Sequence, residues 1–65
     1  MRTRELLDSL SDTIRDRLND YRAIYSASPD RRVASDCIMH YLRGLQDAGA
    51  ITQRGYQMLY IYTTL

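Results

Sequence analysis

The sequence predicts an all-α fold, an antiparallel helical hairpin of two long helices followed by a short third C-terminal helix. Three observations predict it. An apolar side chain recurs once per helical turn through residues 4–25, a second such pattern follows the segment SASPD, and Gly49 ends that second pattern. A chain of 65 residues, 45% of them apolar, has material for one small core. We therefore expect residues 1–65 to form a single helical domain.

The first helix is expected to run from Arg4 to about Tyr25, with Thr3 as its N-cap. Its apolar residues follow one another at intervals of 3, 4, 4, 3 and 4 residues, which places them on one helix face. They are Leu7, Leu10, Ile14, Leu18, Tyr21 and Tyr25, and Leu6 and Ile24 widen the stripe. Because neither Gly nor Pro interrupts the pattern, we predict one unbroken helix.

The second helix is expected from Pro29 to about Ala48, with Ser28 as its N-cap. Proline is favoured at the first position of a helix and disfavours helix at the residue before it. The residues expected to face inward are Val33, Ala34, Cys37, Ile38, Tyr41, Leu42 and Leu45. A connection of about four residues makes the two helices antiparallel neighbours.

Residues 51–65 fit two structures. As a helix, they would use Thr52 as the N-cap, with Ile51 packed on Tyr56 as a hydrophobic staple. As a β-hairpin, they would turn at Arg54-Gly55 before a strand rich in Tyr, Ile and Thr. We predict the helix and keep the β-hairpin as the alternative.

The β-hairpin alternative corresponds to a known architecture. The segment HYLRGLQDAGAITQRGYQMLYIY, residues 40–62, resembles the recognition helix and wing of winged-helix transcription regulators. Their pattern is roughly HxLxxLxxAGxI, followed by a basic turn and a Tyr-rich strand. The resemblance implies a winged-helix α+β fold and DNA binding, with contacts from Arg31, Arg32, His40 and Arg54.

Composition and charge argue against several classes of protein. The net charge of +1 supplies no bulk attraction to nucleic acid or to an anionic membrane. The chain has no apolar run of about 18 residues and no recognisable leader, so we expect a soluble, cytosolic protein. All nine basic residues are Arg and all six aromatic residues are Tyr. Both types are enriched at protein–protein contacts, although codon bias in a GC-rich genome also accounts for the missing Lys.

A row of carboxylates lies opposite the apolar stripe of the first helix, and it consists of Asp8, Asp12, Asp16 and Asp20. Like charges four residues apart each oppose helix formation by about 0.2–0.5 kcal/mol. Two interpretations remain. The row is either a solvated face softened by neighbouring arginines or a binding face for a basic partner, such as the nucleic-acid-binding surface of another protein.

Cys37 and His40 share a helix face but do not make a reactive site. Zinc requires four ligands, and the chain has one Cys and one His. A Cys–His nucleophile would also need an orienting group and an enclosing pocket. We expect Cys37 to be a small core residue, His40 to lie at the edge of the core, and the protein to use no metal, cofactor or catalytic residue.

These observations favour a non-catalytic protein–protein interaction module, a small regulator, inhibitor or adaptor of the kind that a phage or mobile element encodes. Two amphipathic helices and a short third element cover only one face of each other, so we expect a homodimer or docking on a larger protein. The predicted dimer or docking seam comprises Leu10, Ile14, Leu18, Tyr21, Ile38, Tyr41, Leu42 and Leu45.

Overall fold

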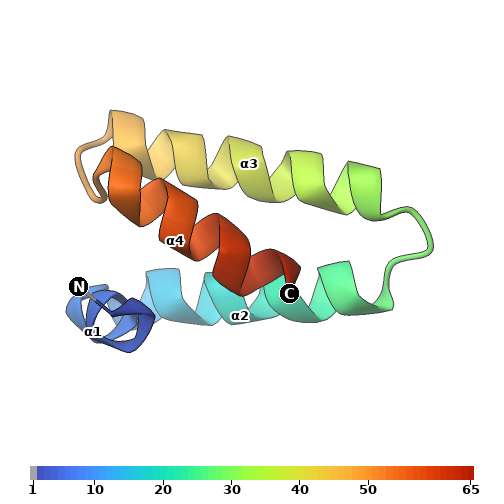
Figure 1. Ribbon diagram of the computed structural model, residues 1–65, viewed down its shortest axis with the longest axis horizontal. Coiled ribbons are helices and arrows are strands. Elements are labelled where there is room, and N and C mark those ends of the chain that lie inside the picture. The colour runs from blue at the N-terminus through green and yellow to red at the C-terminus, as the bar shows by residue number, and fades with distance from the viewer. Residues whose placement is uncertain (1) are drawn as a thin grey trace.

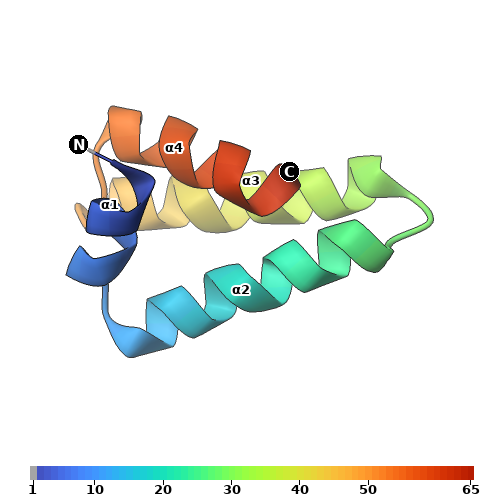
Figure 2. The same cartoon turned by 60° about the horizontal axis from the view of Figure 1, so that its bottom comes forward.

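The chain folds into four helices, which are α1 (Thr3–Ser9), α2 (Asp12–Ala27), α3 (Arg31–Asp47) and α4 (Gln53–Thr64). This computed structural model describes residues 2–65, and no strand occurs within them. α2 and α3 form an antiparallel hairpin, and α4 lies across one side of it (Figure 1). α1 crosses the end at which α2 and α4 begin (Figure 2). The all-α prediction is confirmed, and the winged-helix alternative with its C-terminal β-hairpin is wrong.

The prediction of one unbroken helix over residues 4–25 is also wrong, because the chain bends between α1 and α2. Leu10 is extended, with ψ at 157°, and Ser11 is the N-cap of α2. The Ser11 side chain accepts a hydrogen bond from the backbone N–H of Ile14 at 3.2 Å. A serine hydroxyl competes with helical hydrogen bonding in a helix interior and satisfies a free N–H at a helix start, which explains the break.

Arg15 holds the end of α1 against α2. Its Nε donates to the carbonyl oxygen of Leu7 at 3.1 Å, and its Nη2 donates to that of Leu10 at 3.0 Å. The Ser9 hydroxyl donates to the carbonyl of Leu6 at 2.6 Å. The last carbonyls of a helix have no partner within the helix, so these side chains satisfy groups that the bend leaves free.

The starts of α3 and α4 follow local capping chemistry. Asp30 is the N-cap of α3, and its carboxylate accepts from the backbone N–H of Arg32 at 3.1 Å. The predicted cap at Ser28 is therefore wrong by two residues. Thr52 caps α4 as predicted, because its hydroxyl accepts from the N–H of Gly55 at 3.1 Å. The chain turns out of α3 at Gly49. The φ of this residue is +79°, in the left-handed region that glycine adopts readily.

The core lies where α2, α3 and α4 meet. The largest fully enclosed side chains are Leu18, Ile38, Leu42, Leu59 and Thr63. The Thr63 hydroxyl donates to the carbonyl of Leu59 at 2.8 Å, so its burial leaves no polar atom unsatisfied.

α1 reaches α4 at a glycine. A Cβ added to Gly55 would stand 3.3 Å from the Cβ of Ile51 and 3.7 Å from Cδ2 of Leu6. The close neighbour is therefore Ile51, and Leu6, which is 7% exposed, lies at ordinary van der Waals distance from this position. This contact closes the core at the end of the hairpin.

We predict that replacing Ser11 by Ala lowers the free energy of unfolding by about 1 kcal/mol, because the substitution removes the α2 cap. Chemical denaturation followed by circular dichroism measures the change. Ser26→Ala is the control, since Ser26 is exposed within α2 and alanine is the better helix former. An equal loss in both variants would contradict the capping role of Ser11.

Candidate partner interface

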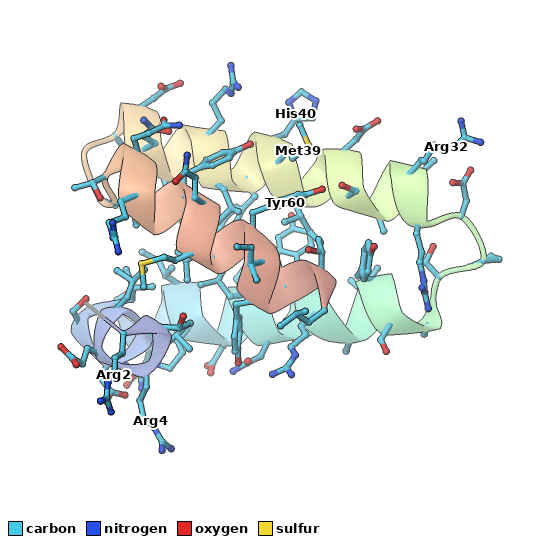
Figure 3. All side chains as sticks on the ribbon, viewed as in Figure 1. Arg2, Arg4, Arg32, Met39, His40 and Tyr60 are labelled. Carbon is cyan, nitrogen blue, oxygen red and sulfur yellow. The ribbon has the colours of Figure 1, made fainter. Side chains whose placement is uncertain are left out.

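α4 covers one side of the α2–α3 hairpin through polar contacts. The Tyr62 hydroxyl donates to Oδ1 of Asn19 on α2 at 2.7 Å, and the guanidinium of Arg22 stands 4.7 Å from the Tyr62 ring centre. On α3, the Ser35 hydroxyl lies 2.7 Å from the Tyr60 hydroxyl. Figure 3 shows Tyr60 reaching from α4 toward α3. These contacts identify the sides of α2 and α3 that face α4.

The opposite side of the hairpin, which we call the hairpin face, carries one stripe from each helix. The residues of each stripe recur at helical intervals, and α4 contacts the other sides of the same helices. The hairpin face comprises Arg17, Tyr21, Ile24 and Ser28 of α2 and its C-cap, together with Val33, Cys37, Tyr41 and Gly44 of α3.

A tyrosine pair joins the two stripes. The rings of Tyr21 and Tyr41 are 5.3 Å apart between centroids, with an interplanar angle of 43°. Ile24 is 55% exposed and Val33 is 60% exposed, although large β-branched side chains are usually inside a small domain. No element formed by residues 2–65 covers this side, because α4 and α1 both lie on the other side of the hairpin (Figures 1 and 2). The hairpin face is therefore an apolar and aromatic surface open to solvent.

The predicted inward orientation of Val33 and Cys37 is wrong, since both are exposed. The apolar arc of α3 is wider than the arc that α2 and α4 cover. The sequence contained a signal for this excess, because Val33 and Ile24 stand at the margins of their stripes rather than at their centres.

The predicted seam lies mostly inside the single chain. Leu10, Leu18, Ile38 and Leu42 are all at most 8% exposed. The remaining members, Ile14, Tyr21, Tyr41 and Leu45, are partly buried against the same core. The prediction treated the third element as too small to cover this surface, whereas α4 and α1 enclose it. Tyr21 and Tyr41 are the members that reach the hairpin face.

The predicted acidic row does not stay on one helix. Asp8 belongs to α1, and the bend at Ser11 separates it from Asp12, Asp16 and Asp20 on α2. The three aspartates of α2 are exposed, and Asp12 pairs with Arg15 at 3.3 Å. A basic partner for these three carboxylates stays a prediction.

The four residues of the alternative DNA interface do not gather on one surface. Arg31 and Arg32 start α3, whereas Arg54 lies in the first turn of α4, at the other end of the molecule (Figure 1). The Arg31 guanidinium stands 5.5 Å from the Tyr25 ring centre. His40 lies between these ends and points away from α4 (Figure 3). The wing that would have carried Arg54 is a helix.

Reactive groups are sparse in the part of the chain that the structure describes. No group of three or more His, Cys, Asp or Glu side chains within residues 2–65 is placed to hold a metal ion. A cleft of about 380 Å³ between α1, α2 and the end of α4 is lined by Thr3, Arg4, Leu7, Asp8, Arg15, Asn19 and Tyr62. Arg15 is already bonded to backbone carbonyls there. None of the helices within residues 2–65 is long and apolar enough to cross a membrane.

Comparison with protein-family models, with curated proteins and with solved structures finds no match for this chain. Its function is therefore inferred from its own residues.

We predict that Tyr41 ionises at higher pH than an ordinary tyrosine. Burial raises the pKa of its hydroxyl above the usual 10.0. The positive charge of Arg17 lowers this pKa, and the neighbouring Tyr21 raises it, but burial is the largest of the three effects. The folded state thus keeps this proton longer than the unfolded state does. The resulting stability is complete below about pH 10 and is lost as the pH rises through the folded pKa.

Ultraviolet titration of tyrosinate measures this ionisation. Tyr41→Phe is expected to remove a high-pH step from the titration of the folded protein. A loss of amplitude near pH 10, with the high-pH step still present, would contradict the raised pKa of Tyr41.

Proposed function

We propose that this protein is a non-catalytic protein–protein interaction module whose docking surface is the hairpin face. One observation carries the proposal. Two apolar side chains, Ile24 and Val33, stand more than half exposed on the side of the hairpin that α4 leaves open, Ile24 about one turn from Tyr21 and Val33 about two turns from Tyr41.

The chemistry of the hairpin face suits a protein partner. Apolar surface gains about 25 cal/mol for each Å² that a partner removes from water. Partly buried tyrosines add large, rigid contact area with a hydroxyl that can remain hydrated, and Tyr and Arg are common anchors of protein interfaces. Arg17 lies beside the tyrosines on the same stripe. The face therefore combines an apolar centre with a charged margin, which is the usual anatomy of an interface.

A second exposed apolar pair, on the outer side of α4, is a weaker candidate. Ile61 is 58% exposed and Leu65 is 80% exposed. Their helix presents Arg54 and Gln57 to solvent as well, and no aromatic pair accompanies them there. This surface supplies a matched control rather than a docking site.

A module of this kind acts by occupying a surface of its partner, as a small regulator, inhibitor or adaptor does. DNA binding is not proposed as its function, because the resemblance that suggested it depended on a wing and residues 53–64 form a helix.

We predict that Ile24→Glu and Val33→Glu each abolish capture of the partner while the fold remains intact. Both side chains are exposed in the free protein, so a carboxylate at either position costs little until a partner removes it from water. Affinity capture from cells of the native host measures binding, and circular dichroism measures folding.

Ile61→Glu is the matched control, since Ile61 is 58% exposed and Ile24 is 55% exposed, both on helices. We expect this variant to bind as the unaltered protein does. Equal binding by all three variants would exclude the hairpin face as the docking surface.

A further inference from the structure

We propose that the junction of Leu10 and Ser11 is a two-state hinge, which is bent in the structure and straight in a minor state of the free protein. In the bent state, α1 crosses the end of the hairpin (Figure 2). In the straight state, α1 leaves α4 and joins α2 in one helix. The bent state predominates because it buries Leu6, which is 7% exposed, and Leu10, which is 8% exposed. The inference goes beyond the proposed function, since neither hinge residue belongs to the hairpin face.

Only two backbone torsions separate the bent junction from a helix. Leu10 has φ at −85° and ψ at 157°, and Ser11 has φ at −64° and ψ at 155°. Both φ values already lie in the range of a right-handed helix, which is about −50 to −90°. Rotation of the two ψ angles to about −42° therefore straightens the junction. Hinges commonly concentrate a large change in a few torsions at the end of an element.

The polar groups at the junction have partners in both states. In the bent state, the Leu7 carbonyl accepts from the Leu10 N–H at 3.2 Å and from Nε of Arg15 at 3.1 Å. The Leu10 carbonyl accepts from Nη2 of Arg15 at 3.0 Å, and the Ile14 N–H donates to the hydroxyl of the cap at 3.2 Å. In a straight helix, each N–H donates to the carbonyl four residues earlier. Ser11 would then donate to Leu7, and Ile14 would donate to Leu10. Neither state leaves these groups unsatisfied.

The apolar side chains keep one helical phase across the junction. Leu10 follows Leu7 by three residues and Ile14 follows Leu10 by four, which are the intervals of one helix face. A helix of seven residues does not persist alone in water, so an α1 that leaves α4 either unwinds or joins α2. The preserved phase favours joining, because the leucines of α1 then extend the apolar stripe of α2.

NMR relaxation dispersion and saturation transfer on the full-length protein test the hinge, because they detect minor states that exchange in microseconds to milliseconds. We expect a minor state whose Cα chemical shifts at Leu10 and Ser11 are helical. Ser11→Ala is expected to raise the population of this state about fivefold, because it removes the α2 cap that only the bent state uses.

Asp12→Pro is expected to abolish the minor state and to keep the bent one. Proline is favoured at the first position of a helix, which Asp12 occupies in α2, and it favours the extended backbone that Ser11 already has. In a straight helix, the same proline would remove the hydrogen bond to the Asp8 carbonyl and clash with that carbonyl. Asp12→Ala is the matched control, since it removes the same carboxylate and its pairing with Arg15 without restricting the backbone. We expect Asp12→Ala to retain the minor state.

A helical minor state that Ser11→Ala enlarges, Asp12→Pro removes and Asp12→Ala retains supports the hinge. A minor state with random-coil shifts at Leu10 and Ser11 overturns it, because α1 then unwinds instead of joining α2. The proposal is also overturned if Ser11→Ala shows no exchange, if the exchange survives in Asp12→Pro, or if Asp12→Ala removes it. Two-dimensional spectra verify that each variant keeps the core of α2, α3 and α4.

Discussion

The bend at Ser11 is the constraint on which the rest of the structure depends. A straight helix over residues 4–25 would carry Leu6 and Leu7 away from the core, whereas the bend folds α1 across the end of the hairpin. The cap at Ser11 and the two hydrogen bonds from Arg15 hold this bend with local polar groups. With α1 turned back, Leu6 closes the core against Gly55 of α4, and the two small helices together enclose one side of the hairpin. The other side is left to solvent or to a partner.

The asymmetry of the two sides follows from how many amphipathic stripes the chain has. α4 contributes Leu59 and Thr63 to the core on the side that it covers. At the edges of this contact, Tyr60 hydrogen-bonds to α3 and Tyr62 hydrogen-bonds to α2. The chain has no further helix to place on the hairpin face. Apolar residues at the edges of the α2 and α3 stripes consequently remain exposed on the hairpin face, whereas α4 covers the other side.

Periodicity predicted much of this fold because burial on a helix repeats every turn. The stripe that contains Leu18 and the stripe that contains Ile38 and Leu42 both form the core, as their spacing predicted. The C-terminal segment is a helix capped by Thr52, although its tyrosines favour a strand. The bend escaped prediction for a physical reason. Leu10 is buried on either structure, so the apolar spacing continues across the break without a gap. The sequence signal for the bend was Ser11 followed by Asp12, because a serine cap and an acid in the first turn are typical of a helix start. The spacing of apolar residues does not contain this signal.

The candidate site was less predictable than the fold. Spacing assigns a residue to a helix face, but it does not say which faces other helices will cover. The predicted seam therefore held core residues such as Leu18, while Ile24 and Val33 passed as ordinary members of their stripes. Which apolar residues stay exposed depends on the position of α4. That position is set by tertiary contacts such as the hydrogen bond between Tyr62 and Asn19, which are 43 residues apart in the chain.

The attachment of α1 has a consequence for the order in which the molecule opens. α1 has seven residues, too few to persist as an isolated helix in water, and its contact with the other helices is centred on α4 at Leu6 and Gly55. The α2–α3–α4 unit keeps the most deeply enclosed side chains to itself. We therefore expect α1 to open as a separate cooperative unit, with its amide hydrogens exchanging while the three-helix core stays closed.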